Sequence, residues 1–218
     1  MHQPEAYNFR LYLANMIQSF ILILLAFWGG INQNKPTTIL FLGDSLTAGY
    51  GLTVEESFPT IAGNILKSMG KNITVINAGI SGETSAGGLS RMDWVLRQPV
   101  DILFLELGAN DGLRGLPVSQ TEKNLQAIID KVKTKNKNTK VVLAGMMVPP
   151  NMGPDYSRAF GQVFKTLAAK NNCTLMPFLL DGVAGIEKLN QPDGIHPNRD
   201  GHKIVGTQVA KILMPLLP

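Results

Sequence analysis

Serine, histidine and aspartate occur in this sequence where they could act together as a nucleophile, a base and an orienting acid. Ser45 follows Gly43 and Asp44 directly after an apolar run, and His196 stands three residues after Asp193. An Asp-x-x-His turn lets the carboxylate reach Nδ1 of the imidazole, which leaves Nε2 to take a proton from a serine hydroxyl. The pattern therefore predicts Ser45 as a nucleophile, with His196 as its base and Asp193 as the partner of His196.

The small number of histidines narrows the choice of base. The chain has three: His2 precedes an apolar segment, and His202 falls inside a predicted helix, which leaves His196. Each motif also has a purely structural interpretation. Asp44 or Ser45 could cap a helix, and the Asp-Gly-x-His stretch could be a surface turn. Phosphate binding is disfavoured, because neither Gly-Lys-Ser/Thr nor G-x-G-x-x-G is present.

A serine nucleophile also needs hydrogen-bond donors for the oxyanion that forms on the attacked carbonyl. Gly82 and Asn110 each follow a further apolar run. The backbone N–H of a glycine in a turn and the amide of an asparagine are suitable donors. Asn110 could instead only hold its own turn, as asparagine often does. The occurrence of these residues after successive apolar runs favours a single site.

The elements that must position these residues can be read from the pattern beyond residue 37. Short apolar runs predict strands at Thr38–Leu42, Ile73–Ile76, Ile102–Leu107, Val141–Gly145 and, more weakly, Thr174–Met176. Amphipathic stretches predict helices near Ser57–Met69, Ser85–Arg97, Ser119–Lys133, Asp155–Asn171 and Arg199–Leu213. Apolar strands separated by helices indicate a parallel sheet covered on both faces. Sites of such sheets lie beyond the carboxyl ends of the strands, where the polar motifs fall.

Four blocks of the sequence together resemble the SGNH (GDSL) hydrolase superfamily. They are GDSLTAGYG with Ser45, NAGISGETS with Gly82, ELGANDGLRG with Asn110 and DGIHPNRDG with His196. The similarity extends to the bacterial thioesterase I / lysophospholipase L1 / arylesterase group and runs from about Thr38 to the C-terminus. It implies an α/β fold: a three-layer α/β/α sandwich with a flavodoxin-like parallel sheet.

The resemblance also implies roles for the residues. Ser45 would be the nucleophile, His196 the general base and acid, and Asp193 its orienting partner. The N–H groups of Ser45 and Gly82 and the side chain of Asn110 would form the oxyanion hole. The implied substrates are small acyl esters and thioesters, including lysophospholipids, cleaved through an acyl-enzyme without metal or other cofactor. A carbohydrate acetylesterase and an inactive envelope binding module are the alternatives on the same fold.

Apolar residues in two loops near the expected site predict a groove for the acyl chain. They are Leu113, Leu116, Val148, Pro149, Met152 and Tyr156. Flexible Met and Leu side chains adapt to acyl chains of different shape. A sugar acetylesterase would need aromatic platforms and polar groups instead, and Tyr156 is the one aromatic residue in these loops. The alternative is that these residues only cover the sheet.

Composition excludes several other classes of protein. The chain has 218 residues, 44% hydrophobic and 17% charged, which fits a folded domain rather than a disordered chain. Its single cysteine, Cys173, cannot form an internal disulfide or a zinc knuckle. The net charge of +4 is scattered without a basic stripe, so nucleic acid is not an expected partner.

The first 36 residues differ from the domain expected over residues 37–218. The apolar stretch Leu11–Ile31 predicts a secretory signal peptide or a membrane anchor, followed by a polar linker. A cut after Gly29 or Gly30 would put Phe27 or Trp28 where small residues are required, so cleavage and anchoring both stay open. Either outcome places the domain in the periplasm or outside the cell, held at the inner membrane if the segment is not cleaved.

Overall fold

The computed structural model describes residues 35–218, of which Pro36–Pro218 form one compact unit. The expected signal or anchor segment, Leu11–Ile31, lies outside the described residues and remains a prediction. Among the residues described, no helix combines the length and the apolar composition needed to cross a membrane.

The unit is built on a five-stranded sheet whose strands are all parallel, in the order β2-β1-β3-β4-β5. The strands are β1 (Thr37–Gly43), β2 (Ile73–Gly79), β3 (Ile102–Leu105), β4 (Lys140–Ala144) and β5 (Thr174–Met176). All five lie where the apolar runs predict them, including the weak β5. This order is that of flavodoxin-like sheets, which confirms the expected fold.

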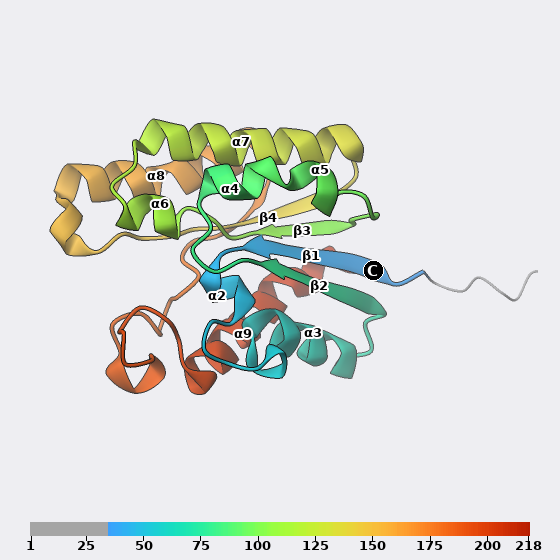
Figure 1. Ribbon diagram of the computed structural model, residues 1–218. Coiled ribbons are helices and arrows are strands. Elements are labelled where there is room, and N and C mark those ends of the chain that lie inside the picture. The colour runs from blue at the N-terminus through green and yellow to red at the C-terminus, as the bar shows by residue number, and fades with distance from the viewer. Residues whose placement is uncertain (1–34) are drawn as a thin grey trace, which may run out of the picture. The chain divides into compact units, whose positions relative to one another are not determined.

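Helices cover both faces of the sheet. They are α2 (Ser45–Ala48), α3 (Phe58–Ser68), α4 (Ser85–Ser90), α5 (Met92–Val95), α6 (Ala109–Leu113), α7 (Val118–Lys135), α8 (Pro154–Asn171) and α9 (Arg199–Leu213), with short 3-10 turns at Val54–Glu56, Pro150–Met152, Glu187–Leu189 and Met214–Leu216. Figure 1 shows α4, α5, α7 and α8 on one face and α3 with α9 on the other, while α2 and α6 lie at the edge where the strands end.

The core follows from the sequence of the central strands. Residues 39–42 of β1 and 102–105 of β3 are buried throughout, because helices cover both faces of these strands. Helices α3 and α9 cross closely at Gly206 of α9. A Cβ added there would lie 2.7 Å from Ile61 of α3, so only glycine fits the crossing.

Two predicted elements differ from the structure. The helix expected over Ser85–Arg97 is two short helices, α4 and α5, divided at Arg91. The Arg91 guanidinium reaches back to the Glu83 carboxylate and to the carbonyl of Ala78, which ties the division to the end of β2. The strand expected over Ile102–Leu107 ends at Leu105, because the chain then turns through Gly108 with φ of 115° into α6.

Candidate active site

Ser45 is the first residue of α2, directly after β1. Asp44 caps this short helix by accepting a hydrogen bond from Leu46 N–H at 2.9 Å. The helix is seated against the end of β2, since Asn77 Nδ2 donates to the carbonyl of Thr47 at 2.8 Å. The predicted capping role of the Gly-Asp-Ser turn is therefore present, and the same turn presents the half-buried Ser45 at the carboxyl edge of the sheet.

The structure brings Ser45, His196 and Asp193 together in one row. His196 Nε2 lies 2.9 Å from Ser45 Oγ, and His196 Nδ1 lies 2.7 Å from Asp193 Oδ2. The other carboxylate oxygen of Asp193 accepts the N–H groups of Ile195 and His196, each at 3.0 Å. The hydrogen bond from the His196 ring and the one from its backbone N–H lower the pKa of Asp193 to about 2. Asp193 is thus a carboxylate at neutral pH.

Contacts of Tyr50 and Gln191 fix the loop that carries His196. The ring of Tyr50 lies against the imidazole, with the ring centroids 4.6 Å apart. Gln191 Nε2 donates to the carbonyl of Tyr50 at 2.7 Å and to that of Pro197 at 3.1 Å. The backbone N–H of Gln191 also donates to the carbonyl of His196, which closes the loop. The loop that carries His196, called the C-terminal loop below, is therefore tied to Tyr50 in the segment that follows Ser45.

Gly82 and Asn110, two of the three predicted oxyanion donors, follow β2 and β3 in the chain. Gly82 has a φ of 79°, which favours glycine, and Asn110 is the second residue of α6. Both line the cavity that contains Ser45 and His196. No acceptor among the described residues takes a hydrogen bond from the backbone N–H of Ser45 or of Gly82. These N–H groups are therefore left for a ligand.

Asn110 is already engaged on both hydrogens of its amide. Its Nδ2 donates to Asp44 Oδ2 at 3.1 Å and to the carbonyl of Glu83 at 3.0 Å. Both partners are acceptors, which fixes the orientation of the amide. The amide therefore links the Ser45 turn to the Gly82 loop, and the guanidinium of Arg114 adds a second link by donating to the Gly82 carbonyl at 2.9 Å.

A cavity of about 750 Å³ is lined by Ser45 and His196 of this row and is mostly apolar. Leu113, Val148 and Pro149 line it, as predicted for the groove. Sequence reasoning missed further apolar lining residues, among them Met146, Met147, Phe178 and Leu180. The two methionines precede Val148, and the other two follow the short β5. The apolar segment after Thr174–Met176 is the signal that could have revealed Phe178 and Leu180.

Three of the predicted groove residues are not among the residues that line the cavity: Leu116, Met152 and Tyr156. Tyr156 turns its hydroxyl away to donate to the carbonyl of Leu116 at 2.7 Å, and its ring stacks on Phe160. Met152 lies beside the turn at Gly115, where an added Cβ would lie 3.4 Å from its Cε. These side chains pack the α6–α7 connection against α8, so proximity in sequence did not place them at the site.

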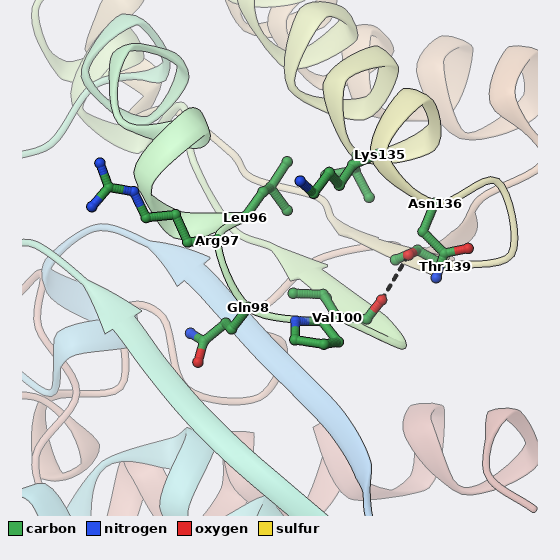
Figure 2. A pocket seen from close by; sticks show the side chains of 9 residues that line it. Leu96, Arg97, Gln98, Val100, Lys135, Asn136 and Thr139 are labelled. Atoms are coloured by element: carbon green, nitrogen blue, oxygen red, sulfur yellow. Dashed lines mark hydrogen bonds between the residues drawn. The ribbon is translucent and has the colours of Figure 1, made fainter.

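A smaller hollow of about 250 Å³ lies at the opposite edge of the sheet, beside the residues that lead into β3 and β4. Figure 2 shows Leu96, Arg97 and Lys135 around it, with the hydroxyl of Thr139 donating to the carbonyl of Val100 at 2.7 Å. None of its lining residues is a serine, cysteine or histidine. This hollow therefore contains no serine–histidine or cysteine–histidine pair. Across residues 35–218, no cluster of three metal-ligating side chains occurs.

The sequence and the fold of this chain are both similar to those of known proteins. The model of the GDSL-like lipase/acylhydrolase family matches residues 41–204. Esterase TesA of Pseudomonas aeruginosa is 39% identical over 186 residues, which cover 85% of this chain and 92% of that protein. The Escherichia coli protein named thioesterase 1/protease 1/lysophospholipase L1 is 39% identical over 198 residues, with 90% of each covered. The crystal structure of TesA matches at a TM-score of 0.79 with 38% identity, over 83% of this chain and 100% of that one. The chain belongs to the GDSL-like lipase/acylhydrolase family.

Proposed function

We propose that this protein hydrolyses acyl esters and thioesters through an acyl-enzyme on Ser45. The observation that carries the proposal is the row of hydrogen bonds from Ser45 Oγ through His196 to Asp193, at 2.9 and 2.7 Å. The names of the relatives, an esterase and a thioesterase/lysophospholipase, support the same substrate classes. Lysophospholipids are included because their acyl ester joins a long chain to a small polar alcohol.

The geometry supports a two-step mechanism. His196 Nε2 takes the proton of Ser45 as Oγ attacks the acyl carbonyl, and the Asp193 carboxylate stabilises the imidazolium. The N–H groups of Ser45 and Gly82 and the amide of Asn110 bind the oxyanion, for which Asn110 shares one of its two existing bonds. His196 then gives its proton to the leaving alcohol or thiol. Water repeats the sequence on the acyl-enzyme and releases the acid.

Hydrolysis of p-nitrophenyl butyrate by the full-length protein tests the proposal. Ser45→Ala should abolish turnover, since no other group in the row can form the acyl-enzyme. Ser81→Ala is the matched control, because Ser81 lines the same cavity without a histidine partner. Equal losses in the two variants, or full activity of Ser45→Ala, would contradict the assignment of the nucleophile.

We also propose that the hydrolase works in the periplasm or outside the cell, exported through Leu11–Ile31. What supports this is the apolar composition of that stretch and the polar linker after it. Cell fractionation with an antibody against the domain tests it. Recovery of the protein with the cytoplasmic fraction would overturn the proposal. A protein that stays with the membranes until detergent is added would indicate that the anchor is not cleaved.

A further inference from the structure

Glu106 is a fully buried acidic residue that the proposed chemistry does not use. It follows β3 directly and is 0% exposed. Its Oε2 accepts hydrogen bonds from Thr47 Oγ at 2.8 Å and from the N–H of Asp44 at 3.2 Å. Its Oε1 is also buried, yet it receives no hydrogen bond from any N–H or O–H group in the described part of the chain. A buried carboxylate with an unsatisfied oxygen and no cation would be unstable.

The neighbour of Glu106 is a second buried carboxyl group, that of Asp44. Asp44 is 0% exposed as well, and its two oxygens accept from Leu46 N–H and from the Asn110 amide. The two groups are neighbours, because Glu106 Oε2 accepts the backbone N–H of Asp44 at 3.2 Å, and the charge of Asp44 raises the pKa of Glu106. Neither carboxyl group forms an ion pair within residues 35–218. Two carboxylates this close cannot both ionise without a strong repulsion.

The backbone at Gly43 leaves no room for a side chain beside Glu106. A Cβ added at Gly43 would lie 2.0 Å from Thr47 Oγ and 2.5 Å from Glu106 Oε2. The glycine of the Gly-Asp-Ser turn is therefore required by the Thr47–Glu106 hydrogen bond that lies beneath the turn. The charged or titratable groups that face the pair are the two carboxyls themselves and, from the C-terminal loop, the imidazole of His196.

We propose that Glu106 is a positioning residue that holds one proton against Asp44, so that Asp44 in turn holds the Ser45 turn and the Asn110 amide in place. The inference rests on the proposed function. The Glu106 carboxylic acid donates to the Asp44 carboxylate, and the shared proton limits the buried charge to one. That single charge binds the Asn110 amide and the cap of α2, and it faces His196.

The titration behaviour of the two groups agrees with this placement of the proton. Burial and then the charge of Asp44 raise the pKa of Glu106 well above its ordinary value. Burial raises the pKa of Asp44 to about 6, while its hydrogen bonds with Leu46, Glu106 and Asn110 oppose the rise. The hydrogen bond between the two carboxyls thus favours the ionised form of Asp44 and the protonated form of Glu106.

Infrared spectroscopy of the full-length protein tests the proton directly, without relying on activity. The parent at pH 7 should show the carbonyl stretch of one protonated carboxylic acid, and Glu106→Gln should lose it. Asp101→Asn is the matched control, because Asp101 lies at the other end of β3 and accepts the N–H of Thr38 at 2.7 Å. This variant should keep the band. A parent spectrum without the band, or a band that survives in Glu106→Gln, would overturn the inference while leaving the hydrolase proposal intact.

Kinetics test the positioning role. Glutamine can accept from Thr47 and donate to Asp44, so Glu106→Gln should keep kcat within about threefold of the parent. Glu106→Leu leaves both donors unpaired and should lower kcat at least about tenfold with little change in KM, since the oxyanion forms only in the transition state. Equal losses in the two variants would contradict the positioning role. If Glu106→Leu does not fold, the infrared band of the parent and of Glu106→Gln still shows whether Glu106 holds the proton.

The pH dependence of stability gives a third readout. The folded protein keeps the Glu106 proton above pH 4.5, where the unfolded chain has released it. The contribution of Glu106 to the stability of the parent therefore falls as the pH rises through this window. Glu106→Gln has no such proton, so the Tm of the variant should increase relative to the Tm of the parent as the pH rises from 5 to 8. A constant difference in Tm over that range would contradict the shared proton.

Discussion

Single residues at this site serve two purposes at once. Asp193 uses one oxygen to form its own turn and the other to orient His196. Asn110 joins Asp44 to the Glu83 carbonyl and also faces the cavity. The structural and functional interpretations of these motifs are therefore not alternatives. A turn that is held by its own side chains is what keeps the reacting groups within hydrogen-bond distance of one another.

Asn110→Ala tests the oxyanion assignment. The loss of one donor should lower kcat by about 10²–10³-fold, with KM much less affected. Arg114→Ala is the control, because it removes a hydrogen bond to the Gly82 carbonyl without removing a donor from the cavity. The measurement is kcat and KM on p-nitrophenyl butyrate. A fully active Asn110→Ala would show that the amide only joins the two loops.

Sequence predicts some of these residues better than others. Ser45, Asp193 and His196 can be identified because their types are chemically distinctive and occur in short polar motifs. Glu106 was included in a predicted strand, Ile102–Leu107, because its neighbours are apolar. A lone carboxyl group inside such a run is itself a signal, since burial of a charge requires a partner. The partner, Asp44, is 62 residues away and can be recognised only in the fold.

At the scale of elements, the long amphipathic helices follow from their periodicity, whereas the short ones do not. Helix α9 matches the predicted Arg199–Leu213 because its apolar face repeats every three to four residues. The stretch Ser85–Arg97 has a similar pattern, yet it divides at Arg91 to reach Glu83. An ion pair between residues eight positions apart overrides the local pattern there, and no periodicity can indicate it.

Helix α9 also carries a buried histidine that should make the fold sensitive to acid. His202 is 1% exposed, and its Nδ1 accepts the N–H of Phe58 at 3.0 Å. Burial, and then the charge of His196, lower the pKa of His202 from 6.5 to about 4. The unfolded chain therefore binds this proton first, and the folded state loses up to about 3 kcal/mol as the pH falls from 6.5 to 4.

His202→Asn should remove this loss of stability between pH 6.5 and 4, because the Asn Oδ1 can accept the hydrogen bond from the Phe58 N–H without titrating. The measurement is urea unfolding of parent and variant at pH 7, 5.5 and 4. His202→Leu is the comparison: it should be less stable at pH 7 but equally insensitive to the imidazole titration. The prediction is wrong if the free energies of unfolding of parent and His202→Asn differ by the same amount at all three pH values.

At the scale of the whole described unit, parallel strands explain how distant motifs meet. All five strands end at one edge, so the loops after β1, β2 and β3 converge on the helix caps there (Figure 1). The sequence indicates this convergence through its alternating apolar runs. It also predicts three residues that line the cavity, Leu113, Val148 and Pro149, but not Phe178 and Leu180, which reach the cavity from a segment whose strand is only three residues long.

Deletion of residues 1–34 should leave a folded and active hydrolase. The unit Pro36–Pro218 contains the sheet, the core and every residue of the candidate site. β1 begins at Thr37, whose N–H donates to the carbonyl of Asn72 at 3.0 Å. Deletion of residues 1–42 is the control, since it removes most of the central strand and should prevent folding. Circular dichroism and ester hydrolysis measure both outcomes, and an unfolded 1–34 deletion would contradict the prediction.

The cavity as a whole should favour medium-length acyl chains over short ones. Its lining is mostly apolar, and its volume of about 750 Å³ exceeds what an acetyl group needs. Each buried methylene contributes up to about 0.8 kcal/mol, so even half of that over four methylenes favours octanoyl over butanoyl esters roughly tenfold in kcat/KM.

The matched pair Leu113→Ser and Leu116→Ser separates this cavity from the general apolar surface around it. Leu113 lines the cavity, whereas Leu116 is not among its lining residues. Only Leu113→Ser should lower the octanoate-to-butyrate ratio, measured with p-nitrophenyl acetate, butyrate, octanoate and decanoate below their micelle concentrations. A steep fall from acetate to octanoate in the parent would instead favour an acetylesterase, because a pocket selective for acetyl groups gains nothing from a longer chain.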